Sequence, residues 1–399
     1  MRIYARWLAL VLIFVIPWEN SLDIDGVGTL ARLVGLLAAG VWALSVLVSG
    51  RIRRPGVFHL FLVMFLIWNA LTVLWSMDQE ATIERVKSYT QHLIMCLLFW
   101  DLLTTRGDVR NALHAYLAGA VVCVGSTIWS FASGIQSDWG RYSAAGFNAD
   151  DAGVIISLGI PIAIYLMGSR EQPENESLAT RLQGWTYLAY VPLALLGIGL
   201  TGTRTALVAA VPGVLLGFGL LGRLRTRQRV LAVALLAGGI LAVQPFVPQD
   251  SIARLSTTTS EITSGTLNGR TYLWSNGLKA FGRRPVSGSG SGSFPRASHT
   301  GQVAHNTPIS VLTETGLVGL ILFVGLMGVS LAAALRHPRR QAMFWLAILA
   351  TWGIGSMALT WEPRKQTWLV LNLVVVSGYA GATRKASPES TPEGLPALA

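Results

Sequence analysis

The chain has 399 residues, of which 52% are hydrophobic and only 13% are charged, and its formal net charge is +11. Soluble domains carry about 25% charged residues, so this composition excludes an ordinary soluble protein and indicates a polytopic membrane protein. We predict an all-α fold with a single transmembrane helical domain over residues 1–385. A disordered cytoplasmic tail, rich in Pro, Ser and Glu, is predicted for residues 386–399.

Apolar segments recur along almost the whole chain. Because hydrocarbon contains no water to satisfy backbone groups, each crossing segment must be a helix of roughly 17 to 25 residues. Twelve spans are predicted, centred on residues 5–18, 29–48, 57–75, 89–104, 111–132, 151–168, 185–200, 204–221, 229–247, 308–335, 341–360 and 366–382. The first follows Arg2 and Arg6 like a signal peptide, but no small-residue cleavage site follows it, so we expect a retained span.

The basic residues predict the orientation of these spans. Of the 31 Lys and Arg residues, 18 fall in short loops or tails on one side, and short loops rich in Lys and Arg face the cytoplasm. The 18 residues are Arg2, Arg6, Arg51, Arg53, Arg54, Arg106, Arg110, Arg170, Arg181, Arg223, Arg225, Arg227, Arg229, Arg336, Arg339, Arg340, Arg384 and Lys385. Both termini are therefore predicted to be cytoplasmic.

The opposite, outer side carries the polar features. Its longest segment runs from about 248 to 307, and we expect short helices within it. The other outer elements are predicted as an acidic first loop, an interfacial helix around 78–89, a loop at 133–151 and tight turns at 201–203 and 361–366. Chemistry is expected on this side.

Three outer arginines indicate an anionic ligand. Arg204 lies in a tight turn at the mouth of a span, where the alternative is a side chain that snorkels to the interface. Arg270 begins a predicted amphipathic helix, where a cation opposes the helix dipole unless an anion is shared there. Arg141 lies just before the sixth span. Converging guanidinium groups match phosphate oxygens, so we predict a lipid diphosphate and no nucleic acid.

The sequence places one histidine, His305, at the outer surface of the membrane. His305 precedes Thr307 and Pro308, which are predicted as N-cap and first residue of the tenth span. An imidazole at this surface is suited to removing a proton from a sugar hydroxyl, although a lone histidine is often structural. The glycine-rich run at 288–293 is either a flexible connector or a loop that closes on a ligand.

Acidic pairs offer a competing metal interpretation. Asp23 with Asp25, and Asp150 with Asp151, are each able to ligate a hard cation. The alternatives are solvated loop charges for the first pair and a helix cap for Asp151.

Several short motifs together resemble the O-antigen ligase and polymerase superfamily. They are residues 203–207 (TRTAL), Arg270 with Trp274, Pro285 leading into 288–294 (GSGSGSF), His305 with Asn306, and 314–316 (ETG). The resemblance implies an inverting, metal-independent glycosyltransferase of the bacterial inner membrane, facing the periplasm and using no cofactor. It would move a polysaccharide from undecaprenyl diphosphate to lipid A-core, in lipopolysaccharide biosynthesis.

The resemblance also implies roles for individual residues. His305 would be the general base, and Arg204 and Arg270 would hold the donor diphosphate, with Arg141 as a further candidate. Asn306, Glu314 and Trp274 would support them. The chain departs from the family at 146–150 (GFNAD), where Asn-Pro-Asn is common.

Other functions stay open at this point. The same chemistry with another acceptor gives an O-antigen polymerase or a protein-directed oligosaccharyltransferase, although the single dominant outer segment favours a ligase. A lipid-linked sugar transporter or flippase would place ionisable residues near the bilayer midplane. Here the charges of interest cluster at one surface, which favours an enzyme.

Overall fold

The computed structural model describes residues 1–24, 28–169, 178–221, 226–263 and 265–380. Its elements are α1 Arg2–Val15, η1 Ile16–Ser21, β1 Asp23–Ile24, β2 Gly28–Thr29, α2 Leu30–Ser49, α3 Val57–Leu71, η2 Thr72–Leu74, α4 Gln79–Leu102, α5 Arg106–Ala132, η3 Asp138–Gly140, α6 Ala149–Gly168, α7 Leu178–Thr201, α8 Arg204–Leu221, α9 Thr226–Val243, η4 Gln244–Phe246, α10 Gln249–Ser256, α11 Thr258–Thr263, α12 Arg270–Arg283, α13 Phe294–Ala297, α14 Thr307–Leu335, α15 Arg339–Ser356 and α16 Lys365–Ala380. Within the described residues, β1 and β2 form the single antiparallel hairpin, of two residues a strand.

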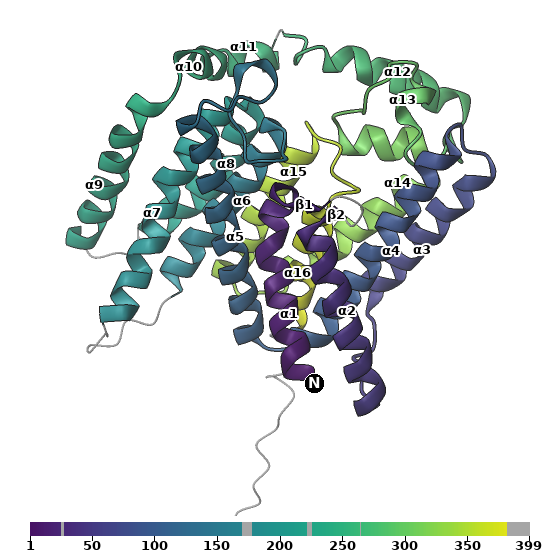
Figure 1. Cartoon of the computed structure of the whole chain (residues 1–399), viewed down its shortest axis with the longest axis horizontal. Helices are drawn as coiled ribbons and strands as arrows, with labels where there is room; N and C mark the ends of the chain where they lie inside the picture. Colours follow the sequence, from purple (N-terminus) through teal and green to yellow (C-terminus); the bar gives the residue numbers. More distant parts are fainter. Residues whose placement is uncertain (25–27, 170–177, 222–225, 264, 381–399) are drawn as a thin grey trace, which may run out of the picture.

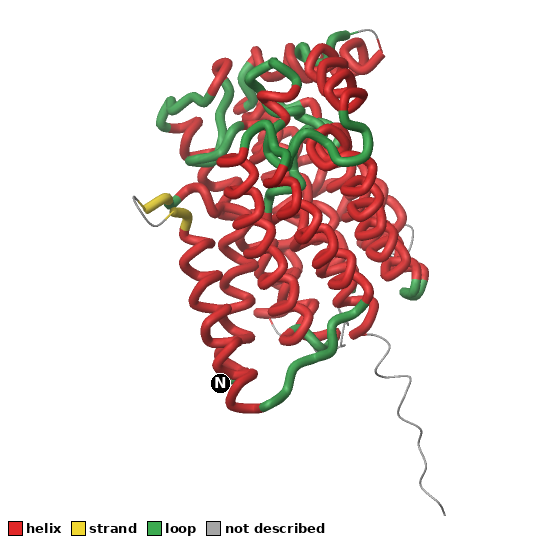
Figure 2. The backbone as a smooth tube through the Cα atoms, turned by 90° about the vertical axis from the view of Figure 1, so that its right-hand side faces the viewer, coloured by secondary structure: helices red, strands yellow, loops and turns green. Residues whose placement is uncertain are grey.

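The long helices run side by side, and the short ones gather at one end. Figure 1 shows α10 to α13 across the top of the bundle, at the end opposite the N-terminus. In the view turned by 90°, most loops gather at that same end (Figure 2). The segment from 248 to 307 thus contains short helices, as predicted. It forms a layer over the ends of α7, α8 and α14, against which α10, α12 and α13 pack.

Each of the twelve predicted spans coincides with one long helix, namely α1 to α9 and α14 to α16. Six helical segments among the described residues are long and apolar enough to cross a membrane. They are Arg2–Ser21, Leu30–Ser49, Val57–Leu74, Arg106–Ala132, Ala149–Gly168 and Thr307–Leu335. The all-α membrane class is therefore confirmed, whereas twelve crossings and their orientation remain predictions.

The helices differ in how far they are buried by their neighbours. In the apolar stretch of α6, 83% of the residues are buried, against 17% in α2. Every residue of α16 from Gln366 to Ser377 is buried as well. Because such a central helix faces protein rather than lipid, it tolerates polar residues that find partners. Asn372 is an example, since its side-chain amide donates to the carbonyl of Cys96 at 3.0 Å.

One sequence prediction changes here, and another is not tested. The interfacial helix expected around 78–89 is the first half of α4, which Asp78 caps by accepting from the N–H of Ala81 at 3.2 Å. A capped start and an unbroken apolar continuation favour one 24-residue helix over two. The predicted disordered tail lies outside the described residues, as do five of the basic residues counted above, Arg170, Arg223, Arg225, Arg384 and Lys385.

Candidate active site

Small residues bring the starts of α6 and α8 together. A Cβ at Gly153 of α6 would lie 2.8 Å from the Cβ of Ala206 in α8, so only glycine permits this approach. One turn further, the Ser157 hydroxyl donates to the carbonyl of Ala206 at 2.9 Å. As a result the hydroxyl of Thr203, in the turn before α8, reaches the carboxylate of Asp150 at 3.2 Å.

Asp150 joins two of the predicted arginines. Its Oδ1 pairs with Nη1 of Arg141 at 2.8 Å, and its Oδ2 pairs with Nη2 of Arg270 at 3.1 Å. The helix α12 begins at Arg270, as predicted. The sequence predicted an anion beside Arg270 at the start of its helix. In the structure this anion is the carboxylate of Asp150, so the position of Arg270 does not by itself require a bound ligand. A bridging carboxylate also fixes the directions of both guanidinium groups.

Arg204 is held by the layer above it. Its Nε donates to the carbonyl of Arg254 at 2.8 Å, and its Nη2 donates to the hydroxyl of Thr257 at 2.6 Å. Its Nη1 donates to Oδ1 of Asn268 at 3.2 Å, and Glu261 lies 3.7 Å away. The tight turn between α7 and α8 is thus confirmed, and the snorkelling interpretation is wrong, because the side chain is anchored to α10 and to the segment before α12.

A fourth arginine belongs to this cluster. The side-chain Nε of Arg254, in the last turn of α10, is buried and has no hydrogen-bond partner among the described residues. Burial lowers the pKa of Arg254, the charges of Arg141 and Arg204 lower it further, and Asp150 opposes them. The sequence did not single out Arg254, because no helix spacing links it to Arg204, 50 positions away.

His305 lies beside the same charges. Burial lowers the pKa of its imidazole below the ordinary value, the positive charge of Arg270 adds to this, and Asp150 and Asp151 oppose it. The ring is therefore neutral at pH 7 and able to accept a proton. Its backbone adopts φ 46°, a left-handed conformation that costs non-glycine residues energy and is often found at functional sites.

Two neighbours hold the backbone around His305. Trp274 of α12 donates its indole N–H to the carbonyl of Ala304 at 3.0 Å. Asn306 caps α14, with Oδ1 accepting from the N–H of Ile309 at 3.0 Å, and its amide donates to the carbonyl of Met357 at 2.9 Å. The predicted cap, Thr307, is wrong by one position, because the Asn306 amide both accepts from the helix and donates across to the end of α15.

Glu314 has a structural place in this layer. Its buried carboxylate accepts from the N–H of Gly292 at 2.7 Å and from that of Phe294 at 3.4 Å. The glycine-rich run therefore lies against α14, where a Cβ at Gly288 would come 2.3 Å from the Glu314 carbonyl. Because its three serines are also buried, the flexible-connector interpretation is wrong.

The acidic pairs are mostly committed to protein partners. Asp151 accepts from the indole N–H of Trp361 at 2.7 Å and pairs with Arg364 at 3.2 Å. The cap of α6 is Asn148 rather than Asp151, since its side chain accepts from the Asp151 N–H at 2.7 Å. Carboxylates neutralised by arginine are poor ligands for a cation, so this pair does not support the metal interpretation. Asp23 lies in β1, and Asp25 is outside the described residues.

The comparisons agree with the predicted resemblance. Residues 189–324 match the family model described as O-Antigen ligase. The chain is also similar to the exopolysaccharide production protein ExoQ of Rhizobium meliloti (strain 1021), with 26% identity over 82% of each chain. The family match contains Arg204, Arg254, Arg270 and His305, whereas Asp150 precedes it.

Proposed function

We propose that the chain, whose residues 189–324 match the family model described as O-Antigen ligase, transfers a glycan from a lipid diphosphate to a sugar hydroxyl at the end of the bundle covered by α10 to α13. The first acceptor we propose is lipid A-core, which makes the protein an O-antigen ligase. The donor is undecaprenyl diphosphate carrying a polysaccharide, and the site faces the periplasm of a bacterial inner membrane.

One observation carries this proposal: four arginines lie near one another, and one of them, Arg270, acts on the neutral imidazole of His305. Arg141 and Arg270 pair with Asp150, and Arg204 meets Glu261 at a longer distance, so the ion pairs seen among the described residues set two carboxylates against four guanidinium groups. The surplus positive charge suits a diphosphate. Arg141 and Arg270 are also mostly buried, with 11% and 14% of their side chains exposed, and limited exposure to water strengthens charge interactions.

The mechanism follows from these placements. Arg204, Arg254 and Arg270 bind the diphosphate oxygens and neutralise the charge that develops as the glycosidic bond breaks. His305 accepts the proton of the acceptor hydroxyl, which attacks the anomeric carbon from the side opposite the leaving diphosphate and inverts its configuration. Trp274, Asn306 and Glu314 position this histidine and the glycine-rich run through contacts with the backbone.

The departure of the diphosphate needs no metal ion in this proposal, because the arginines supply the positive charge. Purified protein treated with a chelator is expected to keep its activity. A loss that added divalent cation restores would instead assign the charge neutralisation to a metal.

A second acceptor is favoured by one specific finding. The similar protein ExoQ is named for exopolysaccharide production, so a polymerase that adds glycan to another lipid-linked glycan is the alternative. The test supplies purified protein with the lipid-diphosphate glycan as donor and, in separate reactions, lipid A-core or a second copy of the glycan lipid as acceptor. Product on lipid A-core supports the ligase, product on the glycan lipid supports the polymerase, and product on neither contradicts both.

A further inference from the structure

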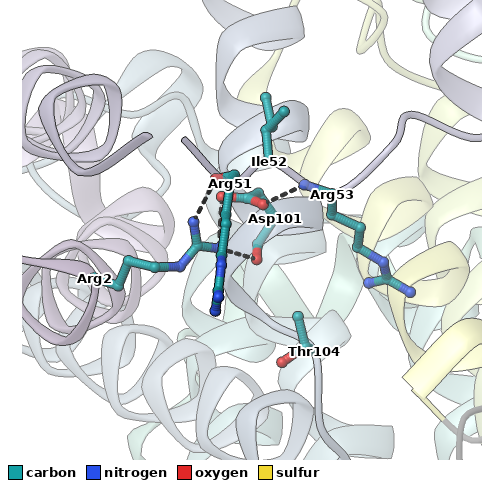
Figure 3. Close-up of a pocket in the computed structure, with 6 residues that line it drawn as sticks. All are labelled: Arg2, Arg51, Ile52, Arg53, Asp101 and Thr104. Carbon is teal, nitrogen blue, oxygen red and sulfur yellow. Dashed lines mark hydrogen bonds and ion pairs between the residues drawn. The ribbon is translucent and has the colours of Figure 1, made fainter. Parts of the chain in front are cut away.

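A cavity lies at the opposite end of the bundle, away from the candidate active site. It has a volume of about 340 Å3 and is lined by Arg2, Arg51, Ile52, Arg53, Asp101 and Thr104 (Figure 3). These residues come from the start of α1, the segment between α2 and α3, and the end of α4 with the residues after it. The size falls within the range of small-ligand sites.

The single carboxylate in this lining is already satisfied. Asp101, whose side chain is 1% exposed, accepts from Nη2 of Arg2 at 2.9 Å and from the indole N–H of Trp42 at 2.9 Å. It also accepts from the backbone N–H of Arg53 at 2.7 Å. Asp101 therefore compensates Arg2, whereas no carboxylate in the part of the chain that the structure describes forms an ion pair with the side chain of Arg51 or Arg53.

Donors in the cavity remain free to bind an anion. The Arg51 side chain is exposed, and no carboxylate among the described residues pairs with it. Arg2 uses three N–H bonds, to the carbonyl of Arg51 and to two oxygens of Asp101, and an arginine has five. Figure 3 shows the side chains of Arg2 and Arg51 together above Thr104, whose hydroxyl adds a further donor.

Arg53 makes the cavity rigid on its other side. Its guanidinium carbon lies 3.7 Å from the centroid of the Trp100 ring, and its Nη1 donates to the carbonyl of Trp100 at 3.1 Å. A cation fixed in this way loses little conformational entropy on binding an anion.

The surroundings indicate a lipid as the source of the anion. Ile3 and Tyr4, next to Arg2, are 62% and 65% exposed, and Leu47 and Val48, one turn before Arg51, are 81% and 72% exposed. Apolar side chains beside a basic cavity match the boundary between acyl chains and headgroups. The general excess of arginine predicted for the cytoplasmic side would explain the positive charge of this region. It would not explain a cavity in which N–H groups of Arg2 and Arg51 are left to donate.

We propose that this cavity binds the phosphate of an anionic phospholipid from the adjacent leaflet, held by Arg2, Arg51 and Thr104 with the acyl chains along α1 and α2. The site is separate from glycan transfer and does not depend on the proposed function.

The test uses the purified full-length protein in neutral detergent, titrated with short-chain phosphatidylglycerol, phosphatidylcholine or inorganic phosphate. Native mass spectrometry counts the bound lipid. Each arginine near a membrane surface contributes about 1 kcal/mol, so Arg51→Ala is expected to weaken phosphatidylglycerol binding about fivefold and Arg51→Glu about thirtyfold. Arg339→Glu, an exposed arginine at the start of α15, is the matched control and is expected to change the affinity less than about twofold.

Unfolding temperatures without lipid show whether each variant is folded, and the Arg51→Ala result stands if the charge reversal fails to fold. Equal losses in Arg51→Glu and Arg339→Glu would overturn the proposal in favour of diffuse attraction. Binding of inorganic phosphate at the same concentrations as phosphatidylglycerol would show that the cavity recognises a free phosphate, and would overturn the lipid as the ligand.

Discussion

Two arginine clusters lie at opposite ends of the bundle, and each is built around one aspartate. Asp150 pairs with two guanidinium groups, those of Arg141 and Arg270, and its side chain is 21% exposed. Asp101 is 1% exposed and pairs with the guanidinium of Arg2, an indole and a backbone N–H. The first aspartate orients charged side chains toward a partly open site, whereas the second joins segments of the fold.

The difference shows how aspartate and arginine, paired with each other, serve two purposes. A carboxylate that bridges two mobile cations sets their geometry for a ligand. A carboxylate buried among an indole, a backbone amide and one arginine mainly satisfies groups that are costly to leave unpaired. The variants below are ordered from the largest expected effect on glycan transfer to the smallest.

His305→Ala is expected to lower the transfer rate by about 10²- to 10⁴-fold, the usual contribution of a general base. The measurement is product formation by purified protein under saturating donor. An unchanged unfolding temperature would show that the variant is folded. Turnover close to that of the wild type would remove the role of base from His305.

Arg270→Ala is expected to lower kcat/KM for the donor by about 10- to 100-fold, because a hydrogen bond to a charged group contributes about 1.5 to 3 kcal/mol. Arg270→Lys should restore only part of this, since a lysine lacks the planar fork that binds two oxygens. Full rescue by lysine would mean that only the charge matters. Arg204 and Arg254 give parallel tests, and Arg283, exposed at the end of α12, is the matched control.

Asp150→Asn and Asp101→Asn form a direct test of the comparison. Asp150→Asn is expected to lower transfer by about tenfold, because Arg141 and Arg270 lose the anion that fixes them. Asp101→Asn should leave transfer near normal and lower the free energy of unfolding by about 1 to 3 kcal/mol, since buried donors lose their acceptor. Equal effects of both variants on transfer and on stability would show that the two clusters have the same role.

The pH dependence of kcat/KM is expected to change least in these variants, but it is the most specific test of the charges around His305. Because the pKa of His305 is lowered, the imidazole is neutral at pH 7, and kcat/KM should fall only as the pH drops through a midpoint below 6.5. Arg270 lowers this pKa and Asp150 raises it. Arg270→Lys keeps the charge and should leave the midpoint unchanged, whereas Arg270→Ala should raise it and Asp150→Asn should lower it. Shifts in the reverse directions would separate the titrating group from this cluster.

The membrane class, the helical segments and several candidate site residues were readable from the sequence. Apolar periodicity and the lack of water in hydrocarbon determine where helices form, which is why twelve long helices match twelve predicted segments. Arg204, Arg270 and His305 were likewise visible, because each stands at a helix start or a tight turn where its residue type is unusual. Local rules are sufficient for features of this kind.

Only the tertiary structure decided which of these residues meet. The partnership of Asp150 with Arg270 spans 120 positions and depends on the first turns of α6 and α12 being brought together. The unpaired Nε of Arg254 and the cavity around Arg2 and Arg51 also have no sequence signature. Side-chain pairing between distant segments follows from helix packing, which depends on shape and small residues such as Gly153 across the whole bundle.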